Sequence, residues 1–441
     1  MGDRISGMTE SITRRRFLRQ GAAAGVALSS AAGARPPGEV RIGFLGVGSR
    51  GMAHVREFLK LDRATLKAVC DIVPERVERA QAAIVKAGRP APEGYSRGEY
   101  DYRRLCARED LDLVVISTPW EWHAKMCVDA MRSGKHAAVE VPAAVNLEEC
   151  WQLVETAEKT GRQCIQMENC NYDRVELMAH AMVRRGLLGE LVHAECGYLH
   201  DLRDSLLRLR DGKRSWRLEH AIRRNADLYP THGLGPVAQT MNINRGNLFD
   251  HMVSLASKSA SLHQFALERY GPASPQAEWK FALGDVVSTL IRTRAGETIL
   301  VTHDITTPRP YSRRYLIQGS RGILQKYPTP LVYLDGRSPH HEWEDLLARY
   351  APAWEHPLWK ALAERARGAG HGGMDFIMNY RIVESLLGGA PMEMDVYDAA
   401  ALSAVIELSE RSIAGRGKTV DFPDFTRGKW KERPPVGIVE A

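Results

Sequence analysis

A glycine-rich turn between a short apolar strand and a helix constrains the fold of this chain more than any other feature. The apolar run 40–45 leads directly into Gly46-x-Gly48-x-x-Gly51, and a helical pattern follows to about residue 60. A second strand, 66–71, ends in Asp71. Such a turn sets free N–H groups and the positive end of a helix dipole against a phosphate. The sequence therefore predicts a dinucleotide-binding Rossmann domain.

The carboxylate of Asp71 indicates which dinucleotide the domain prefers. At the end of the second strand it can accept hydrogen bonds from both ribose hydroxyls, and it would repel a 2′-phosphate. Arg50 is the opposing hint, because an arginine after the second glycine could pair with that phosphate. We expect NAD rather than NADP.

Strands and helices alternate as far as about residue 168. Buried strands are expected at 113–118 and 136–141, and helices at 74–87 and about 123–133. This alternation predicts an α/β fold with an N-terminal doubly wound parallel sheet. We place this domain at 35–168.

Beyond residue 169 the pattern changes. Strands expected at 191–199, 286–294 and 298–304 follow one another, with a hairpin turn at 294–297. We expect a C-terminal substrate-binding α+β domain, 169–441, with a largely antiparallel sheet. The arginine-rich segment 202–224 has no clear period and is interpreted as a long loop near the site.

The first 34 residues have the features of a twin-arginine export signal. Paired arginines precede Phe17-Leu18, a small apolar run covers 21–32, and Ala32-Gly33-Ala34 offers a cleavage site. The apolar run is far shorter than the roughly 20 residues that cross a bilayer. We therefore expect a periplasmic or otherwise exported protein with no membrane span after removal of residues 1–34.

Charge and cysteine usage exclude several partners. The formal net charge is +6, about half of it in the first 34 residues, and no basic block with aromatics follows, so nucleic acid is not expected. The seven cysteines form no C-x-x-C pair and no zinc-type spacing with histidine. They are predicted to be buried free thiols, and no metal site is predicted. A homo-oligomer is left open.

Further motifs resemble those of a known family. The glycine motif, Asp71, Thr118-Pro119-x-x-x-His123 and Glu140-x-Pro142 resemble the Gfo/Idh/MocA superfamily of NAD(P)-dependent sugar enzymes. Trp120-Glu121-Trp122-His123, Tyr229-Pro230-Thr231-His232-Gly233 and the run 241–247 resemble one branch of it, glycoside hydrolase family 109, the NAD-dependent α-N-acetylgalactosaminidases. The resemblance extends from about residue 40 to Trp430.

The resemblance implies specific contacts. For NAD, in addition to the motif glycines Gly46, Gly48 and Gly51, it implies contacts at Ser49, Arg50, Asp71, Trp120, Glu121, Trp122, His123, Glu140, Val141 and Asn169. For the terminal sugar of a small molecule or glycan it implies Tyr198, Arg217, Tyr229, Pro230, Thr231, His232 and Tyr311. The superfamily's dehydrogenases usually carry lysine where this chain has Val141, which cannot exchange a proton and suits the glycosidase branch.

The expected chemistry is a glycosidase reaction through NAD with no net redox. The sugar is oxidised at C3, loses its C2 proton and its leaving group, adds water and is reduced again. His232 is the first candidate for acid or base, because imidazole titrates near neutral pH, and Tyr229 is the second. Two rivals stay open: a periplasmic NAD(P)-dependent sugar oxidoreductase of the same superfamily, and a sugar-binding protein that keeps NAD as a structural piece.

Overall fold

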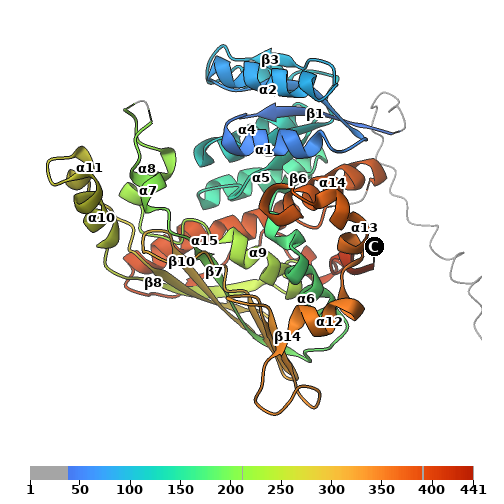
Figure 1. Ribbon diagram of the computed structural model, residues 1–441, viewed down its shortest axis with the longest axis vertical. Helices are drawn as coiled ribbons and strands as arrows, with labels where there is room; N and C mark the ends of the chain where they lie inside the picture. The colour runs from blue at the N-terminus through green and yellow to red at the C-terminus, as the bar shows by residue number, and fades with distance from the viewer. Residues whose placement is uncertain (1–37, 211, 390–391, 441) are drawn as a thin grey trace, which may run out of the picture. The chain divides into compact units, whose positions relative to one another are not determined.

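The computed structural model describes residues 38–210, 212–389 and 392–440 (Figure 1). The predicted export signal, residues 1–34, lies outside these ranges. Residues from Glu39 onward form one compact unit. Within the described ranges, no helix combines the length and apolarity needed to span a bilayer.

A six-stranded sheet forms the N-terminal part of this unit. Its order is β3-β2-β1-β4-β5-β6, and each neighbouring pair is parallel. The strands are β1 (Val40–Leu45), β2 (Ala64–Cys70), β3 (Glu93–Tyr95), β4 (Leu113–Ile116), β5 (His136–Val139) and β6 (Cys164–Gln166). The predicted doubly wound parallel sheet is confirmed.

Alternate residues of these strands enter two different cores. In β4, Leu113 and Val115 belong to the core that holds α1 (Ser49–Phe58) and α2 (Pro74–Lys86). Val114 and Ile116 belong to the core with α4 (Trp120–Arg132) and α5 (Leu147–Thr160). Helices therefore cover both faces, which is why the strands are apolar throughout rather than alternating. A short helix, α3 (Tyr102–Cys106), joins the α4 side.

A nine-stranded sheet forms the C-terminal part. Its order is β14-β13-β12-β11-β7-β10-β9-β8-β15. Among the described strand pairs of this sheet, only β7 and β10 are parallel. The strands are β7 (Leu191–Leu199), β8 (Phe249–Ala256), β9 (Val287–Thr293), β10 (Thr298–Asp304), β11 (Leu316–Gly319), β12 (Gly322–Gln325), β13 (Leu331–Leu334), β14 (Glu344–Asp345) and β15 (Val420–Asp421). The predicted largely antiparallel sheet is confirmed.

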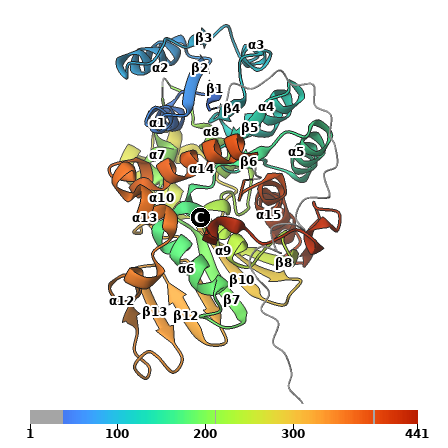
Figure 2. The same cartoon turned by 90° about the vertical axis from the view of Figure 1, so that its right-hand side faces the viewer.

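Helices cover one face of this second sheet. The helices α6 (Arg174–Arg184), α9 (Thr231–Thr240) and α15 (Val396–Ala414) share a core with Ala194, Ile299 and Ile317 of its strands (Figure 2). Strand β9 alternates buried and exposed residues, as expected for a sheet with one solvated face. Further helices of this part are α10 (Ser261–Tyr270), α11 (Pro275–Glu278), α12 (Leu346–Trp354), α13 (Pro357–Ala366) and α14 (Met374–Gly388).

The segment 202–224 is not the long loop that its sequence suggested. It contains α7 (Arg203–Leu207) and α8 (Trp216–Arg223). Ser215 caps α8, because its hydroxyl oxygen accepts a hydrogen bond from the N–H of Leu218 at 3.2 Å. Helices of five and eight residues are too short to show a period of 3.6 residues, which is why the pattern missed them.

The C-terminal part of the chain returns to the first sheet. Phe376, Ile377 and Val383 of α14 share a core with Val55 and Phe58 of α1. Helix α14 therefore packs beside the helix that begins at the glycine-rich turn (Figure 2).

Candidate functional site

One cavity of about 650 Å³ opens above the carboxyl ends of the parallel strands. Gly46, Asp71, Thr118 and Glu140 line it, and they follow β1, β2, β4 and β5 respectively. This is the edge at which open α/β sheets bind ligands. Residues of the C-terminal part complete the wall, among them Tyr198, Arg217, Tyr229, His232 and His371.

The glycine-rich turn forms the nucleotide end of the cavity. Gly46 has φ +79°, and a Cβ there would lie 2.8 Å from the carbonyl oxygen of Ser117, so the position requires glycine. A Cβ on Gly51 would lie 1.9 Å from the carbonyl oxygen of Gly46. A Cβ on Gly48 would meet only Arg76 Nη1 within 4 Å, at 3.7 Å, so the backbone here can lie close to a phosphate. The α1 N-terminus has no side-chain cap, so its N–H groups can bind an anion.

Asp71 is held in place by backbone hydrogen bonds. Its Oδ2 accepts from the N–H of Val47 and its Oδ1 from the N–H of Val73, both at 3.0 Å. A carboxylate has about four lone-pair sites, so further donors such as ribose hydroxyls can still be bound. The open cradle at Gly48 and this fixed carboxylate fit NAD, which is the cofactor of this Rossmann domain.

Arg50 serves a different purpose from the one that its position suggested. Its Nε donates to Glu140 Oε1 and its Nη1 to Asp375 Oδ2, each at 2.6 Å. Burial acts to lower the pKa of Arg50, but the charges of these two carboxylates outweigh burial and raise it. Because two buried anions share the guanidinium, it is not available for a 2′-phosphate. The opposing hint for NADP therefore disappears.

Aromatic rings form the other end of the cavity. Trp120 stacks on Tyr229 with ring centroids 5.4 Å apart and an angle of 18°. Tyr198 meets Tyr229 edge-on at 4.8 Å. The guanidinium of Arg217 lies 5.0 Å from the Tyr229 ring centroid and 5.2 Å from that of Trp120. Its Nε is buried and has no hydrogen-bond partner in the described part of the chain, so it can serve a polar ligand group.

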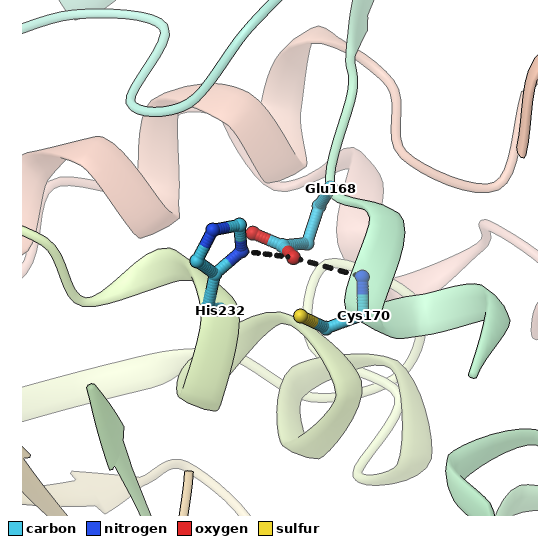
Figure 3. A group of neighbouring side chains, drawn as sticks. All are labelled: Glu168, Cys170 and His232. Carbon is cyan, nitrogen blue, oxygen red and sulfur yellow. Dashed lines mark hydrogen bonds and ion pairs between the residues drawn. The ribbon is translucent and has the colours of Figure 1, made fainter. Parts of the chain in front are cut away.

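His232 is positioned by a buried carboxylate (Figure 3). Its Nδ1 lies 2.7 Å from Oε1 of Glu168, which is fully buried. The same oxygen accepts from the N–H of Cys170 at 3.0 Å. Burial alone would raise the pKa of Glu168, but the charge of His232 and the hydrogen bond from it lower that pKa below its ordinary value. A Cβ on Gly235 would lie 2.8 Å from Glu168 Cγ, so glycine lets α9 approach this side chain.

Glu168, Cys170 and His232 also offer ligand atoms within 4.8 Å of one another. That spacing would suit a metal ion. In the structure, however, Glu168 Oε1 and His232 Nδ1 are already paired with each other at 2.7 Å. The absence of a metal site stays a prediction from the sequence.

The other candidate residues divide into two groups. Ser49, Trp122, His123, Val141 and Asn169 line the cavity together with the residues described above. Both ring nitrogens of His123 lie near carbonyl oxygens, of Pro142 at 2.7 Å and Thr118 at 2.8 Å, so this ring joins the loops that follow β5 and β4. Gly51, Glu121, Pro230, Thr231 and Tyr311 do not line the cavity, although Tyr311 lies 6.1 Å from Tyr198, ring to ring.

Sequence reasoning missed several residues of this site. Glu168 lies two residues after the short strand β6, at the same carboxyl edge of the sheet as Asp71 and Glu140. That position after a strand could have identified it as a candidate. Trp216 and Arg76 line the cavity from segments without a motif. His371 lines the cavity as well, from the glycine-rich turn Gly370–Gly373. Its partner Asp375 pairs with Arg50 across 325 residues, which no local pattern reveals.

Two family models match the chain. "Glycosyl hydrolase 109, C-terminal domain" covers residues 172–432, and "Oxidoreductase family, NAD-binding Rossmann fold" covers residues 40–168. The alpha-N-acetylgalactosaminidase of Shewanella oneidensis is 47% identical over 405 residues, which are 91% of this chain and 88% of that protein. Glycosyl hydrolase family 109 protein 1 of Shewanella sp. strain ANA-3 has the same identity and coverage.

Solved structures show the same fold at much lower identity. An NAD-binding oxidoreductase from Klebsiella pneumoniae aligns with a TM-score of 0.69 at 20% identity, over 87% of this chain and 98% of that one. An inositol dehydrogenase homologue from Azotobacter vinelandii, complexed with NAD⁺, aligns with a TM-score of 0.65, also at 20% identity, over 87% and 98%.

Proposed function

Because this chain belongs to glycosyl hydrolase family 109, we propose that it hydrolyses terminal α-linked N-acetylgalactosamine, the activity in the name of its Shewanella oneidensis relative. It is an NAD-dependent glycoside hydrolase. The observation that carries the proposal is that three features share one cavity. They are His232 bound to the Glu168 carboxylate, the Arg217 guanidinium against aromatic rings, and the glycine-rich turn.

The two ends of the cavity have separate tasks. Gly48, the first turn of α1 and Asp71 would hold the nucleotide. NAD bound there supplies a hydride acceptor and returns the hydride, so that the reaction has no net redox. Arg217 would anchor a hydroxyl or acetamido oxygen of the sugar through its free Nε.

His232 is the proposed base. Its Nδ1–H donates to Glu168, which fixes the tautomer that leaves Nε2 free to take a proton from the sugar. The Glu168 carboxylate then stabilises the charged ring. Burial raises the pKa of Tyr229 well above its ordinary value, although the charge of Arg217 opposes this. A phenol that keeps its proton can donate a hydrogen bond to the leaving oxygen or to a sugar hydroxyl.

The cavity offers no convincing pair of carboxylates for ordinary glycoside hydrolysis. Among the described residues that line it, the acidic ones are Asp71, Glu99 and Glu140. Asp71 is hydrogen-bonded at the nucleotide end. Burial would raise the pKa of Glu140, but Arg50 and His54 lower it to about 2, so it cannot act as an acid near neutral pH. This supports the route through NAD.

The decisive experiment offers the purified protein an aryl N-acetyl-α-galactosaminide without an added electron acceptor. We expect release of the phenol, together with exchange of the C2 hydrogen with solvent. His232→Ala should lower kcat by about 10²–10⁴-fold, the usual contribution of a general acid or base. The exposed His263 on α10 gives a matched control, His263→Ala, which should keep full activity.

The result also separates the rivals. Turnover only with an acceptor would indicate the sugar oxidoreductase, which the buried, apolar Val141 disfavours because it cannot exchange a proton. Binding of the sugar with no turnover under either condition would indicate the NAD-keeping binding protein.

We also propose export by the twin-arginine route, which carries folded proteins. The paired arginines 14 and 15 ahead of Phe17-Leu18 support this, and a resident cofactor would need loading before export. Replacing both arginines with lysine should leave the full-length protein in the cytoplasm of a suitable host. The mass of the secreted form would also test cleavage near Ala34, and its native mass the homo-oligomer left open by the sequence.

A further inference from the structure

Tyr198 and the residue two positions after it form a pair at the aromatic end of the cavity. Residues at i and i+2 of a strand point to the same face of a sheet. Tyr198 is the penultimate residue of β7, and His200 directly follows that strand. The hydroxyl oxygen of Tyr198 lies 3.0 Å from Nδ1 of His200. Tyr198 lines the cavity, whereas His200 does not.

Backbone hydrogen bonds fix the strand end beside His200. The N–H of Leu199 donates to the carbonyl oxygen of Ser312 at 3.0 Å, and the N–H of Ser312 donates back at 2.9 Å. This pairing brings Tyr311 to the imidazole of His200, with ring centroids 5.1 Å apart and an angle of 83°. His200 therefore contacts both Tyr198 and Tyr311, two of the tyrosines that the resemblance implies for the sugar.

Two glycines bring this pair next to His232. A Cβ on Gly233 would lie 2.2 Å from the backbone nitrogen of Gly197, so glycine lets α9 approach β7 this closely. The ring centroid of Tyr198 lies 5.5 Å from that of His232. The direction of the Tyr198 hydroxyl therefore affects the candidate site directly.

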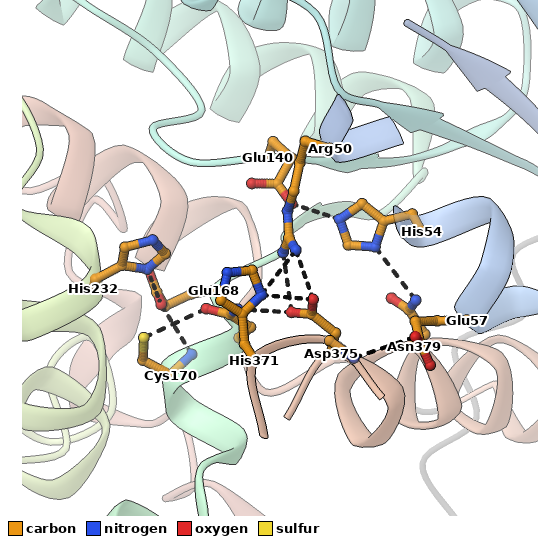
Figure 4. A network of polar contacts seen from close by, with 12 residues as sticks. Arg50, His54, Glu57, Glu140, Glu168, Cys170, His232, His371, Asp375 and Asn379 are labelled. Atoms are coloured by element: carbon orange, nitrogen blue, oxygen red, sulfur yellow. Dashed lines mark hydrogen bonds and ion pairs between the residues drawn. The ribbon is translucent and has the colours of Figure 1, made fainter. Parts of the chain in front are cut away.

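The charged side chains on the other side of His232 already have partners. Arg50 is paired with two carboxylates, and Glu168 is paired with His232 at 2.7 Å (Figure 4). The hydrogen bond of the Tyr198 hydroxyl is instead with His200.

The proton in this hydrogen bond belongs to Tyr198. Burial raises the pKa of Tyr198, although the charge of Arg217 opposes this, so the phenol keeps its proton. Burial and the charge of Arg217 lower the pKa of His200 against the opposing charge of Asp201, so the ring is neutral near neutral pH. A neutral imidazole has one nitrogen that accepts, and a guanidinium can only donate. The phenol O–H therefore donates to Nδ1 of His200 and points away from Arg217.

The remaining capacity of the Tyr198 oxygen is that of an acceptor. A phenol has one O–H, and once its proton is directed to His200, the oxygen can only accept from other groups. A sugar offers suitable donors in its hydroxyl groups and its acetamido N–H. A site that fixes the direction of a hydrogen bond in this way discriminates against a substrate group that cannot match it.

We propose that His200 is a positioning residue of the sugar site. It holds the O–H of Tyr198, so that the Tyr198 oxygen accepts a hydrogen bond from a hydroxyl or amide N–H of the terminal sugar. The inference rests on the proposed function, since it takes that sugar as the substrate. It adds to the site a histidine that neither lines the cavity nor belongs to the residues that the resemblance implies.

The test compares two histidines of the same segment. His200→Leu keeps a side chain of similar size and removes the acceptor, whereas His200→Asn puts an amide oxygen near the place of Nδ1. His193→Leu is the matched control: His193 lies on β7, its Nδ1 is 2.8 Å from the hydroxyl of Thr298, and neither residue lines the cavity. Release of phenol from an aryl N-acetyl-α-galactosaminide is measured for each variant.

We expect His200→Leu to lower kcat/KM about tenfold, the effect of losing one hydrogen bond. His200→Asn should recover most of this loss, and His193→Leu should match the wild type. Adding His200→Leu to Tyr198→Phe should cost nothing further, because phenylalanine has no hydroxyl to direct.

Three kinetic results would overturn the positioning role while leaving the proposed function standing. They are equal kcat/KM in His200→Leu and the wild type, a loss in His200→Asn as large as in His200→Leu, and fully additive losses in the double variant.

Nitrogen NMR of protein labelled at histidine determines the tautomer without turnover. The His200 signal, identified by its absence from His200→Asn, should show an unprotonated Nδ1 and a protonated Nε2. A protonated Nδ1 would overturn the inference whatever the kinetics. A wild type that releases no phenol would overturn the proposed function, and the sugar contact of Tyr198 with it.

Discussion

At the scale of single residues, His232 and Glu168 form a pair in which each side chain sets the state of the other. The buried carboxylate stays ionised because the imidazole donates to it. The imidazole in turn is held in one tautomer, and its ring centroid lies 4.9 Å from that of Tyr229. Such a pairing would let the proposed base keep one orientation rather than rotate freely.

Glu168→Gln tests this pairing. The amide oxygen can still accept from Nδ1, but the negative charge that stabilises the protonated ring is gone. We expect kcat to fall about tenfold to a hundredfold, as when a partner of a functional histidine is removed, with KM changed less. The pH profile of kcat should also shift, because the charge beside the titrating ring has changed.

A structural role alone would give a different result. The suitable control is Glu393→Gln, which alters a buried glutamate that accepts from the Tyr172 hydroxyl at 2.9 Å, outside the cavity. If both variants lost activity in proportion to their loss of thermal stability, with unchanged pH profiles, Glu168 would be a packing residue.

Residues predicted from local signals line the cavity. The glycine motif, Asp71 and His232 each stand in a short segment whose turn and helix can be seen in the sequence. Glu168 approaches His232 across 64 residues, and Arg50 approaches His371 across 321. Tertiary packing decides such pairs, so spacing along the chain could not identify them.

At the scale of elements, α1 combines three tasks in ten residues. Its N-terminus faces the cavity, and its apolar residues Val55 and Phe58 pack in a core. Its polar residues Arg50 and His54 form hydrogen bonds with α14. Gly48, just before α1, and Gly51, in its first turn, differ in the space around them, so their substitutions should have different effects.

Gly51→Ala and Gly48→Ala separate folding from cofactor binding. A Cβ on Gly51 would meet backbone at 1.9 Å, so we expect a loss of more than about 4 kcal/mol in unfolding free energy, or no folded protein. Gly48 has φ −68°, and an added Cβ would make ordinary van der Waals contact with Arg76 Nη1 at 3.7 Å, so Gly48→Ala should fold with nearly normal stability. Its methyl group would occupy the phosphate cradle, and the variant should purify with much less NAD.

Urea unfolding and the NAD content of each variant are the measurements. A Gly48→Ala protein that retains full NAD would show that the nucleotide does not approach this backbone. A stable Gly51→Ala protein would show that the backbone at Gly46 and the first turn of α1 can move apart without a loss of unfolding free energy.

Helices and strands could be predicted where the spacing of apolar residues in the sequence follows a helical or strand pattern. Strands buried on both faces gave continuous apolar runs, and β9 with its neighbour β10 gave a hairpin with a clear turn. The helices α7 and α8 are too short to show a period. The Ser215 cap was the remaining signal for α8.

At the scale of the whole molecule, a buried ionic group links segments that are far apart in the sequence. Arg50 comes from α1, Glu140 from the end of β5 and Asp375 from α14. Glu140 also accepts from His54 at 2.5 Å. Removing one member leaves the others buried with an uncompensated charge.

Asp375→Asn should therefore lower the unfolding free energy at neutral pH by about 3–5 kcal/mol, as for other broken buried pairs. The sign of its pH dependence follows from the lowered pKa of Asp375. Its contribution is complete above the ordinary value of 3.8 and is lost as pH falls below it. The difference between variant and wild type should shrink in strong acid.

Urea unfolding at pH 7, 5 and 3 measures this difference. Glu364→Gln is the control, since its ion pair with Arg367 is 78% and 75% exposed and should contribute nothing measurable. A gap between Asp375→Asn and the wild type that stayed constant down to pH 3 would contradict the ionic explanation.

The rings of Trp120 and Trp216, which both line the cavity, meet edge to face with their centroids 4.7 Å apart. Indole emits light in the range that reduced nicotinamide absorbs and oxidised nicotinamide does not. Their fluorescence should therefore dim and recover within each turnover, giving the molecule a built-in optical readout that needs no dye.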